Sequence, residues 1–397
     1  MTTSDLDALV RGTPSSRDRA MDFLRAASIV AVVFGHWFIS INHWEGGVIR
    51  STSAIGVTPG LWLFTWVFQV MPVFFFVGGF SNLVAYDSTR RKGQSTGTFI
   101  RGRLERLLRP SIVFLGLWAV VQIVLHVADV GAATGPRLWG DTTLLRGMKP
   151  PGATIPFGPL WFLGVYLVVV TVAPVMVVLH ERFRVAAVVG LGVAAVAIDV
   201  ARIAFEVPGI GLLNFAVVWL FVHQLGFFYA DGTFTRKGRG FFAALTAVGF
   251  SGLVLLTNIG VYSRSMVGVS DGAVSNNAPP SVCICFLAMA MIGAAMLLRP
   301  AASRMLERRR VWAVTIGVNS VIMTAYLWHL SAMVLAVLVV YPLGWPQPDA
   351  GTPAWWALRP LWLGILTVFL IPFVKAFGRF ERPGRRLPSN HSLAGGV

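Results

Sequence analysis

The chain has 397 residues, of which 55% are hydrophobic and only 13% are charged. Soluble globular domains carry about 25% charged residues. The composition therefore excludes an ordinary cytosolic enzyme and a disordered protein. Apolar runs of about 20 residues recur along the chain, and each is long enough to cross a bilayer as a helix. The sequence predicts an all-α, polytopic membrane protein.

We expect a bundle of about ten transmembrane helices. In chain order, the predicted spans lie near residues 21–41, 61–86, 111–130, 157–179, 185–205, 209–229, 241–262, 281–298, 314–341 and 355–377. The fifth span carries Asp199 and Arg202 in its second half, where charged groups are costly in lipid. We expect no cleaved signal peptide, because the polar start of the chain lacks its pattern.

Lys and Arg residues are unevenly divided between the predicted loops. Of the 33 in the chain, 26 fall on one side of the membrane and 7 on the other. Because cytoplasmic loops are rich in Lys and Arg, this division predicts that both termini are cytoplasmic. The net charge of +16 is then mainly a topology signal, and we expect membrane lipids rather than nucleic acid as partners.

The predicted organisation has three parts. Residues 1–20 form a cytoplasmic N-terminal tail, residues 21–378 form the membrane domain, and residues 379–397 form a basic, disordered cytoplasmic tail. Three external loops, at residues 42–60, 131–156 and 263–280, are rich in Gly, Pro, Ser and Asn and are long enough to cover a site. Cys283 and Cys285 fit buried positions, and the sequence holds no metal-binding motif, so we expect no metal.

His36 is the most informative ionisable residue inside a predicted span. It follows Arg25 by eleven residues, which is about three helical turns and a rise of roughly 16 Å, so both side chains face one side of a helix. An imidazole at this depth can exchange a proton with a hydroxyl, and the Arg can hold a phosphate or carboxylate. A packed His that bonds a backbone carbonyl explains the position equally well. Asp22, one turn before Arg25, either orients the guanidinium or only caps the helix.

Two further pairs suggest binding functions. Arg103 and Arg106 lie one turn apart at the end of a cytoplasmic loop and suit a phosphorylated ligand, although topology alone also explains basic loops. Tyr326 and His329 share one face of the ninth span at a depth similar to that of His36. They could bond an acceptor hydroxyl or a thioester carbonyl, or only each other.

Two external residues are weaker candidates for substrate binding. Trp161 opens the fourth span at its external end, where Trp is also a common interface anchor. Asn277 lies in the external turn at residues 275–280, whose amides could bind a sugar. Turn chemistry also explains that composition.

Five motifs occur in an order that resembles a known family. They are Asp22-Phe-Leu-Arg25 with His36, the run Phe-Phe-Phe-Val-Gly-Gly-Phe at 74–80, the Arg-rich run at 99–110, Pro-Leu-Trp-Phe-Leu at 159–163, and Tyr-Leu-Trp-His at 326–329. Together they resemble the acyltransferase family 3 membrane proteins, which O-acylate carbohydrates and lipid-linked glycans. The resemblance covers roughly residues 17–377 and fits ten spans with cytoplasmic termini.

The resemblance implies specific roles. Arg25 and His36 would be the essential catalytic pair, and Arg103 and Arg106 would engage the acyl donor. Arg109 stands where the family usually has Pro or an apolar residue, so a shift of that element to Arg106 and Arg109 stays open. The donor would be acyl-CoA, with acetyl-CoA as first choice, and the acceptor a carbohydrate or glycolipid. The protein would lie in the plasma (inner) membrane; the resemblance names no protein partner.

The predicted function is acyl transfer from cytoplasmic acyl-CoA to a hydroxyl group. His36 would deprotonate this hydroxyl, which attacks the thioester, while Tyr326 and His329 stabilise the oxyanion. A covalent acyl-His36 intermediate remains open. A glycan or lipid transporter is the alternative, because intramembrane His and Arg also mark proton pathways. A non-catalytic subunit of an envelope assembly is a third possibility.

Overall fold

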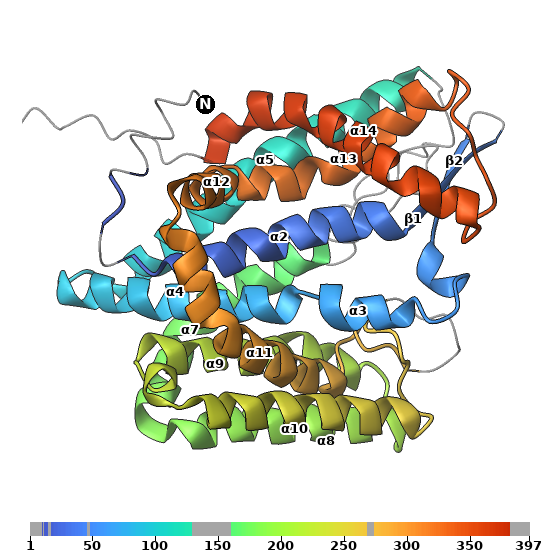
Figure 1. The fold of residues 1–397 in the computed structure, drawn as a ribbon. Helices are drawn as coiled ribbons and strands as arrows, with labels where there is room; N and C mark the ends of the chain where they lie inside the picture. Colours follow the sequence, from blue (N-terminus) through green and yellow to red (C-terminus); the bar gives the residue numbers. More distant parts are fainter. Residues whose placement is uncertain are drawn as a thin grey trace, which may run out of the picture.

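The computed structural model describes residues 10, 12–14, 17–45, 48–128, 160–267 and 274–381. Long helices lie side by side in a bundle (Figure 1). In chain order they are α2 (Arg19–Ile39), α4 (Met71–Arg91), α5 (Thr96–Val127), α7 (Trp161–Phe183), α8 (Val185–Ile203), α9 (Asn214–Ala230), α10 (Arg239–Asn258), α11 (Val282–Glu307), α13 (Ile322–Val340) and α14 (Pro353–Phe377).

Shorter elements complete the described part of the chain. They are the helices α3 (Trp62–Phe68) and α12 (Arg309–Asn319), the strands β1 (Ser40–Glu45) and β2 (Val48–Ser53), and the 3₁₀ turns η1 (Ala54–Gly56), η3 (Ile210–Leu213), η4 (Phe234–Arg236) and η5 (Gly378–Glu381).

The predicted polytopic helical bundle is confirmed. Within the described residues, nine helices are long and apolar enough to cross a membrane. The third predicted span corresponds to the second half of α5, which is not among those nine. It nevertheless packs into the bundle: the Phe114 ring lies 4.9 Å from the Trp328 ring, and Trp118 Nε1 donates to Ser331 Oγ at 3.0 Å.

The outer surface of the bundle is apolar. On α8, Val189, Val193 and Val196 are all exposed, and α10 and α14 expose similar side chains. By contrast, α13 is apolar on every side and most of it is buried. An exposed apolar surface this extensive is stable in lipid rather than in water.

Two hydrogen bonds help to identify one end of the bundle. Arg19 Nη1 at the start of α2 donates to the carbonyl oxygen of Leu306 at 3.1 Å. Glu381 of η5 accepts the backbone N–H of Met323 at the start of α13, at 3.0 Å. We call this the arginine-rich end, and the opposite end, which carries β1 and β2, the hairpin end. Arg25 of α2 also lies within electrostatic reach of Glu381, so both ends of the described chain lie at this end of the bundle.

Two predicted spans are interrupted in the structure. The span predicted at 314–341 is wrong as one helix, because it breaks at Ser320 and Val321 into α12 and α13. Ser320 Oγ bonds the carbonyl oxygen of Gly317 at 2.7 Å, which ends α12. Figure 1 shows α12 almost end-on, turned away from the long helices. The span at 61–86 breaks at Gln69 into α3 and α4, with Pro72 in the first turn of α4.

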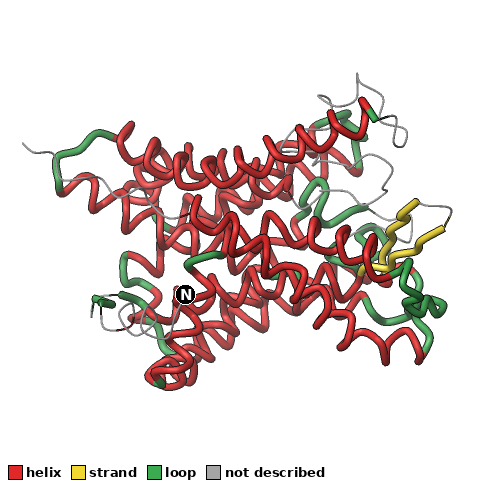
Figure 2. Tube along the Cα trace, turned by 90° about the horizontal axis from the view of Figure 1, so that it is seen from above, coloured by secondary structure: helices red, strands yellow, loops and turns green. Residues whose placement is uncertain are grey.

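The predicted loop at 42–60 contains regular structure that the sequence analysis missed. Strands β1 and β2 pair antiparallel, from Ser40 opposite Ser53 to Glu45 opposite Val48. Figure 2 shows this hairpin at one end of the bundle. The predicted loop at 131–156 and most of the two predicted tails lie outside the described residues. The predicted boundary at residue 378 falls in η5.

The glycines of the Phe-rich motif allow α4 and α9 to pack very closely. A Cβ atom on Gly79 would lie 1.9 Å from the carbonyl oxygen of His223, and one on Gly226 would lie 2.1 Å from that of Phe76. Small residues permit such backbone approach between membrane helices. The close packing places Asn82 of α4 beside His223 of α9, where their side chains meet at 3.0 Å.

Candidate active site

Two histidines from distant helices meet inside the bundle. Nδ1 of His36 on α2 lies 3.0 Å from Nε2 of His329 on α13. The two rings are stacked, with centroids 5.2 Å apart and planes 14° apart. The sequence placed both residues at similar depth, but it could not show that they touch.

The hydrogen bonds define which ring nitrogens carry protons. His329 Nδ1 lies 2.5 Å from the carbonyl oxygen of Tyr326, which can only accept, so His329 donates there. In a neutral His329, Nε2 is then the acceptor, and Nδ1 of His36 donates to it. In a neutral His36, this leaves the lone pair on Nε2. The pair thus favours the tautomer in which His36 Nε2 can take up a proton.

Both histidines are held in place by backbone contacts. Trp37 Nε1 donates to the carbonyl oxygen of His329 at 3.0 Å, and Ser40 Oγ donates to that of His36 at 2.6 Å. His329 is almost fully buried. Because both nitrogens of His329 are already engaged, its geometry fits the orientation of His36 better than the predicted oxyanion contact.

A cavity lies beside His36. Four of the residues selected from the sequence line it together: His36, Trp161, Tyr326 and Asn277. Aromatic side chains, among them those of Phe64, Phe68 and Phe162, form much of the remaining wall. A mostly apolar cavity with a few polar groups is typical of a small-molecule site.

Sequence analysis missed one polar residue of this cavity. Gln69 lies at the break between α3 and α4, is buried, and donates from Nε2 to Oδ1 of Asn277 at 3.0 Å. Ser275 Oγ accepts the backbone N–H groups of Asn277 and Ala278, so turn chemistry fixes the loop. The only sequence signal for Gln69 is an uncharged polar residue within an apolar run, close to Pro72.

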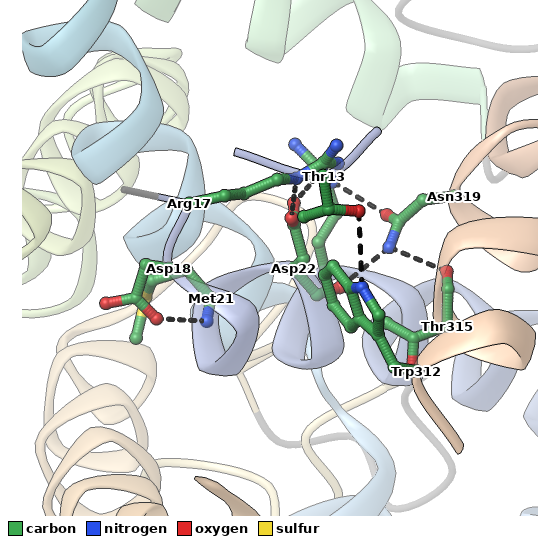
Figure 3. Close-up of polar contacts among 9 residues, drawn as sticks. Thr13, Arg17, Asp18, Met21, Asp22, Trp312, Thr315 and Asn319 are labelled. Carbon is green, nitrogen blue, oxygen red and sulfur yellow. Dashed lines mark hydrogen bonds and ion pairs between the residues drawn. The ribbon is translucent and has the colours of Figure 1, made fainter. Parts of the chain in front are cut away.

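Arg25 is oriented by a network at the arginine-rich end. Asp22 forms ion pairs with both Arg25 and Arg17, and Arg25 Nε donates to Oδ1 of Asn319 on α12 at 2.9 Å. Asn319 Nδ2 donates to the carbonyl oxygens of Asp22 and Thr315, as Figure 3 shows. The predicted pairing of Asp22 with Arg25 is present. About a third of the Arg25 side chain stays exposed, so it can reach a ligand.

Arg103 and Arg106 differ in burial. Arg103 is partly buried and donates to the carbonyl oxygen of Ser81, within electrostatic reach of Tyr166, Arg106 and Arg25. Its Nε is buried and has no partner among the described residues. Arg106 is exposed and lines a groove along α5 that also includes Arg109. The two guanidinium groups therefore do not face one common pocket.

The buried carboxylate of Asp199 has structural partners. Asp199 accepts from Asn214 Nδ2, the Tyr262 hydroxyl and the N–H of Val282, and pairs with Arg202 at 3.2 Å. These contacts tie α8 to the start of α11. In the described part of the chain, no group of three or more His, Cys, Asp or Glu residues could hold a metal ion.

Membrane-spanning helices surround the partly buried His36, the buried His329 and a cavity, and together they define an integral membrane protein with an internal candidate site. A family model described as an acyltransferase domain matches residues 18–377, so the chain belongs to this acyltransferase family. The protein is a multi-pass membrane acyltransferase, and the resemblance drawn from the sequence is confirmed. Comparisons with curated proteins and with solved structures found no match.

Proposed function

We propose that this acyltransferase moves an acyl group, with acetyl as the first candidate, from cytoplasmic acyl-CoA to a hydroxyl of a cell-envelope carbohydrate or glycolipid. The plasma (inner) membrane is the proposed location. One observation carries the proposal: His36, oriented by His329, lines the same cavity as Trp161, Tyr326 and Asn277.

The donor would bind from the arginine-rich end, which the distribution of Lys and Arg assigns to the cytoplasm. Arg25 and the inward-turned Arg103 are the proposed phosphate contacts, because guanidinium groups bind phosphate through two hydrogen bonds. The rise of α2 between Arg25 and His36 is roughly 16 Å. An extended pantetheine arm can bridge this distance and bring the thioester to His36.

The reaction at His36 would be a direct acyl transfer. The acceptor hydroxyl gives its proton to Nε2 of His36 while its oxygen forms a bond to the thioester carbonyl carbon. The carbon–sulfur bond then breaks, and the CoA thiolate takes the proton from His36. His329 keeps the His36 ring in the required tautomer and orientation. Tyr326, on the cavity wall, remains our candidate for contact with the oxyanion.

The acceptor would enter from the hairpin end. There, Gln69 and Asn277 present amide groups to the cavity, and their mutual hydrogen bond uses only one donor and one acceptor. Amides that offer both donors and acceptors suit a hydroxyl-rich acceptor. Trp161, in the same wall, supplies an apolar ring surface.

The test is label transfer by purified protein in nanodiscs, with radiolabelled acetyl-CoA and envelope extract. Wild-type protein is expected to move label into a glycan or glycolipid fraction, and His36→Ala is expected to lose this activity. His180→Gln is the matched control, since His180 is a buried histidine that bonds Gln224 and Asp231 instead. Absence of both label transfer and CoA binding in the wild type would favour a transporter. Label retained on the protein would indicate an acyl-enzyme.

A further inference from the structure

Tyr166 of α7 is a polar residue inside the bundle that the proposed reaction does not use. The residues that share its side of the helix are all buried: Phe162, Val169, Val170 and Ala173. Tyr166 itself is only partly buried. Because this side of α7 faces the bundle, the exposed part of Tyr166 is open to the inside of the protein rather than to lipid.

The hydroxyl group of Tyr166 points to the glycine motif of α4. The rings of Phe74 and Phe75 on α4 lie 5.4 Å and 5.6 Å from the Tyr166 ring, centre to centre. A Cβ atom on Gly78 would lie 2.9 Å from the hydroxyl oxygen of Tyr166. A side chain at position 78 would therefore displace the hydroxyl group, and Gly78 leaves room for it.

Along α4, this hydroxyl group lies between the candidate active-site cavity and Arg103. Met71, at the start of α4, lines the cavity, and the carbonyl oxygen of Ser81 accepts from Arg103. Gly78 comes seven residues after Met71 and three before Ser81, which on a helix are rises of roughly 10 Å and 5 Å. The hydroxyl group is thus placed on the side of the cavity from which the proposed donor arrives, about one helical turn from the contact of Arg103.

The surroundings of the Tyr166 hydroxyl group favour an anion. Arg103 and Arg25 both lie within electrostatic reach of Tyr166. Arg103 forms no ion pair with a carboxylate in the described ranges, and an uncompensated cation is costly where it is partly buried. A phosphate group would offset that cost. Phosphate oxygens also accept from hydroxyl groups, and such charge-assisted hydrogen bonds are strong.

The hydroxyl hydrogen of Tyr166 is available for such a contact. Asn82 is a side-chain hydrogen-bond partner of Tyr166. Oδ1 of Asn82 has no partner among the described residues, so the amide nitrogen is the group that donates to the hydroxyl oxygen. The hydroxyl group accepts in this bond and keeps its own hydrogen for a ligand.

We propose that the Tyr166 hydroxyl group is a third phosphate contact of the donor site, beside Arg25 and Arg103. The proposal rests on the proposed function, because the phosphate would belong to the acyl-CoA donor. It also gives the glycine motif of α4 a second role: Gly226 and Gly79 bring α4 and α9 together, and Gly78 keeps the place of the hydroxyl group free.

The experiment measures ligand binding without any acyl transfer. Calorimetry on the nanodisc protein would compare CoA, its two phosphorylated halves, 3′,5′-ADP and 4′-phosphopantetheine, and pantetheine, which has no phosphate. Tyr166→Phe keeps the ring, so the protein should fold, and its affinity for CoA should fall about tenfold or more. At least one phosphorylated half should show the same loss, and pantetheine should show none. Wild-type affinity for CoA in Tyr166→Phe would overturn the proposal.

Two further variants make the test specific. Gly78→Ala leaves Tyr166 in the chain but displaces its hydroxyl group, so it should also weaken CoA binding. Tyr341→Phe is the matched control, since the Tyr341 hydroxyl donates to the carbonyl oxygen of Asn42 at the hairpin end, at 3.2 Å. At saturating acyl-CoA, Tyr166→Phe should keep the wild-type kcat and acceptor KM. An equal loss of CoA affinity in Tyr341→Phe would contradict a direct contact.

The result can be separated from the proposed function. Loss of CoA affinity in Tyr166→Phe, with no acyl transfer by the wild type, would reject the proposed function alone. Acyl transfer by the wild type, with unchanged CoA affinity in Tyr166→Phe, would reject the phosphate contact alone. A wild-type protein that does not bind CoA would reject both.

Discussion

Removal of His329 tests whether the histidine pair works as a unit. In His329→Ala, His36 loses the acceptor 3.0 Å from its Nδ1 and the stacked ring beside it. One such hydrogen bond contributes about 0.5–1.5 kcal/mol, which corresponds to roughly a two- to tenfold effect on rate. Free rotation of His36 adds to this loss, since general base catalysis as a whole contributes about 10²–10⁴-fold. We therefore expect a rate loss between these limits.

The assay is the initial rate of label transfer from acyl-CoA, with acyl-CoA binding measured on the same sample. His329→Ala should lower kcat and leave donor affinity unchanged, because His329 contacts His36 rather than the arginines proposed to bind the donor. His329→Gln should recover part of the rate, since its side-chain oxygen can accept from His36 Nδ1. Full activity in His329→Ala, or loss of donor binding with unchanged kcat, would refute the positioning role.

Three further predictions follow from the geometry. Arg103→Gln should weaken acyl-CoA binding about tenfold or more. Arg106→Gln should change this binding little, because Arg106 faces the outer groove. Equal losses of affinity in a binding titration would contradict this distinction. Gln69→Leu should raise the KM for the acceptor and leave that for acyl-CoA unchanged, since Gln69 bonds Asn277 on the cavity wall; an unchanged acceptor KM would exclude that contact. Gly226→Ala should destabilise the protein by about 1–3 kcal/mol in thermal unfolding, because its Cβ would lie 2.1 Å from the Phe76 carbonyl oxygen. Gly190→Ala, with no atom within 4 Å, is its control, and equal stability of the two would contradict the packing argument.

Hydropathy predicts the crossings of this fold but not their interruptions. The length of an apolar run shows whether it can cross the bilayer as a helix. Nine helices of the described chain are long and apolar enough to do so. Hydropathy does not show where one apolar run bends into two helices, as α12 and α13 do at Ser320 and Val321. The hairpin at β1 and β2 escaped prediction because its residues lack a strong alternation of polar and apolar side chains.

The candidate site was predictable in its parts and not in its contacts. Helical rise gives the depth of His36 and His329, but their direct contact joins residues 293 positions apart. The same applies to Arg25 and Asn319, which are 294 positions apart. A spacing of three residues predicts that Arg103 and Arg106 lie near each other on one helix. It does not show that only Arg103 is turned towards the bundle.

The most direct test of the account is the rate of acyl transfer by His36→Ala and His36→Gln in nanodiscs at saturating acyl-CoA. The account predicts that both variants bind acyl-CoA as the wild type does, because Arg25, a proposed phosphate contact, lies roughly 16 Å away from His36 along α2. Both should transfer acyl groups about 10²–10⁴-fold more slowly. A variant that binds the donor and transfers at the wild-type rate would contradict the central role of His36.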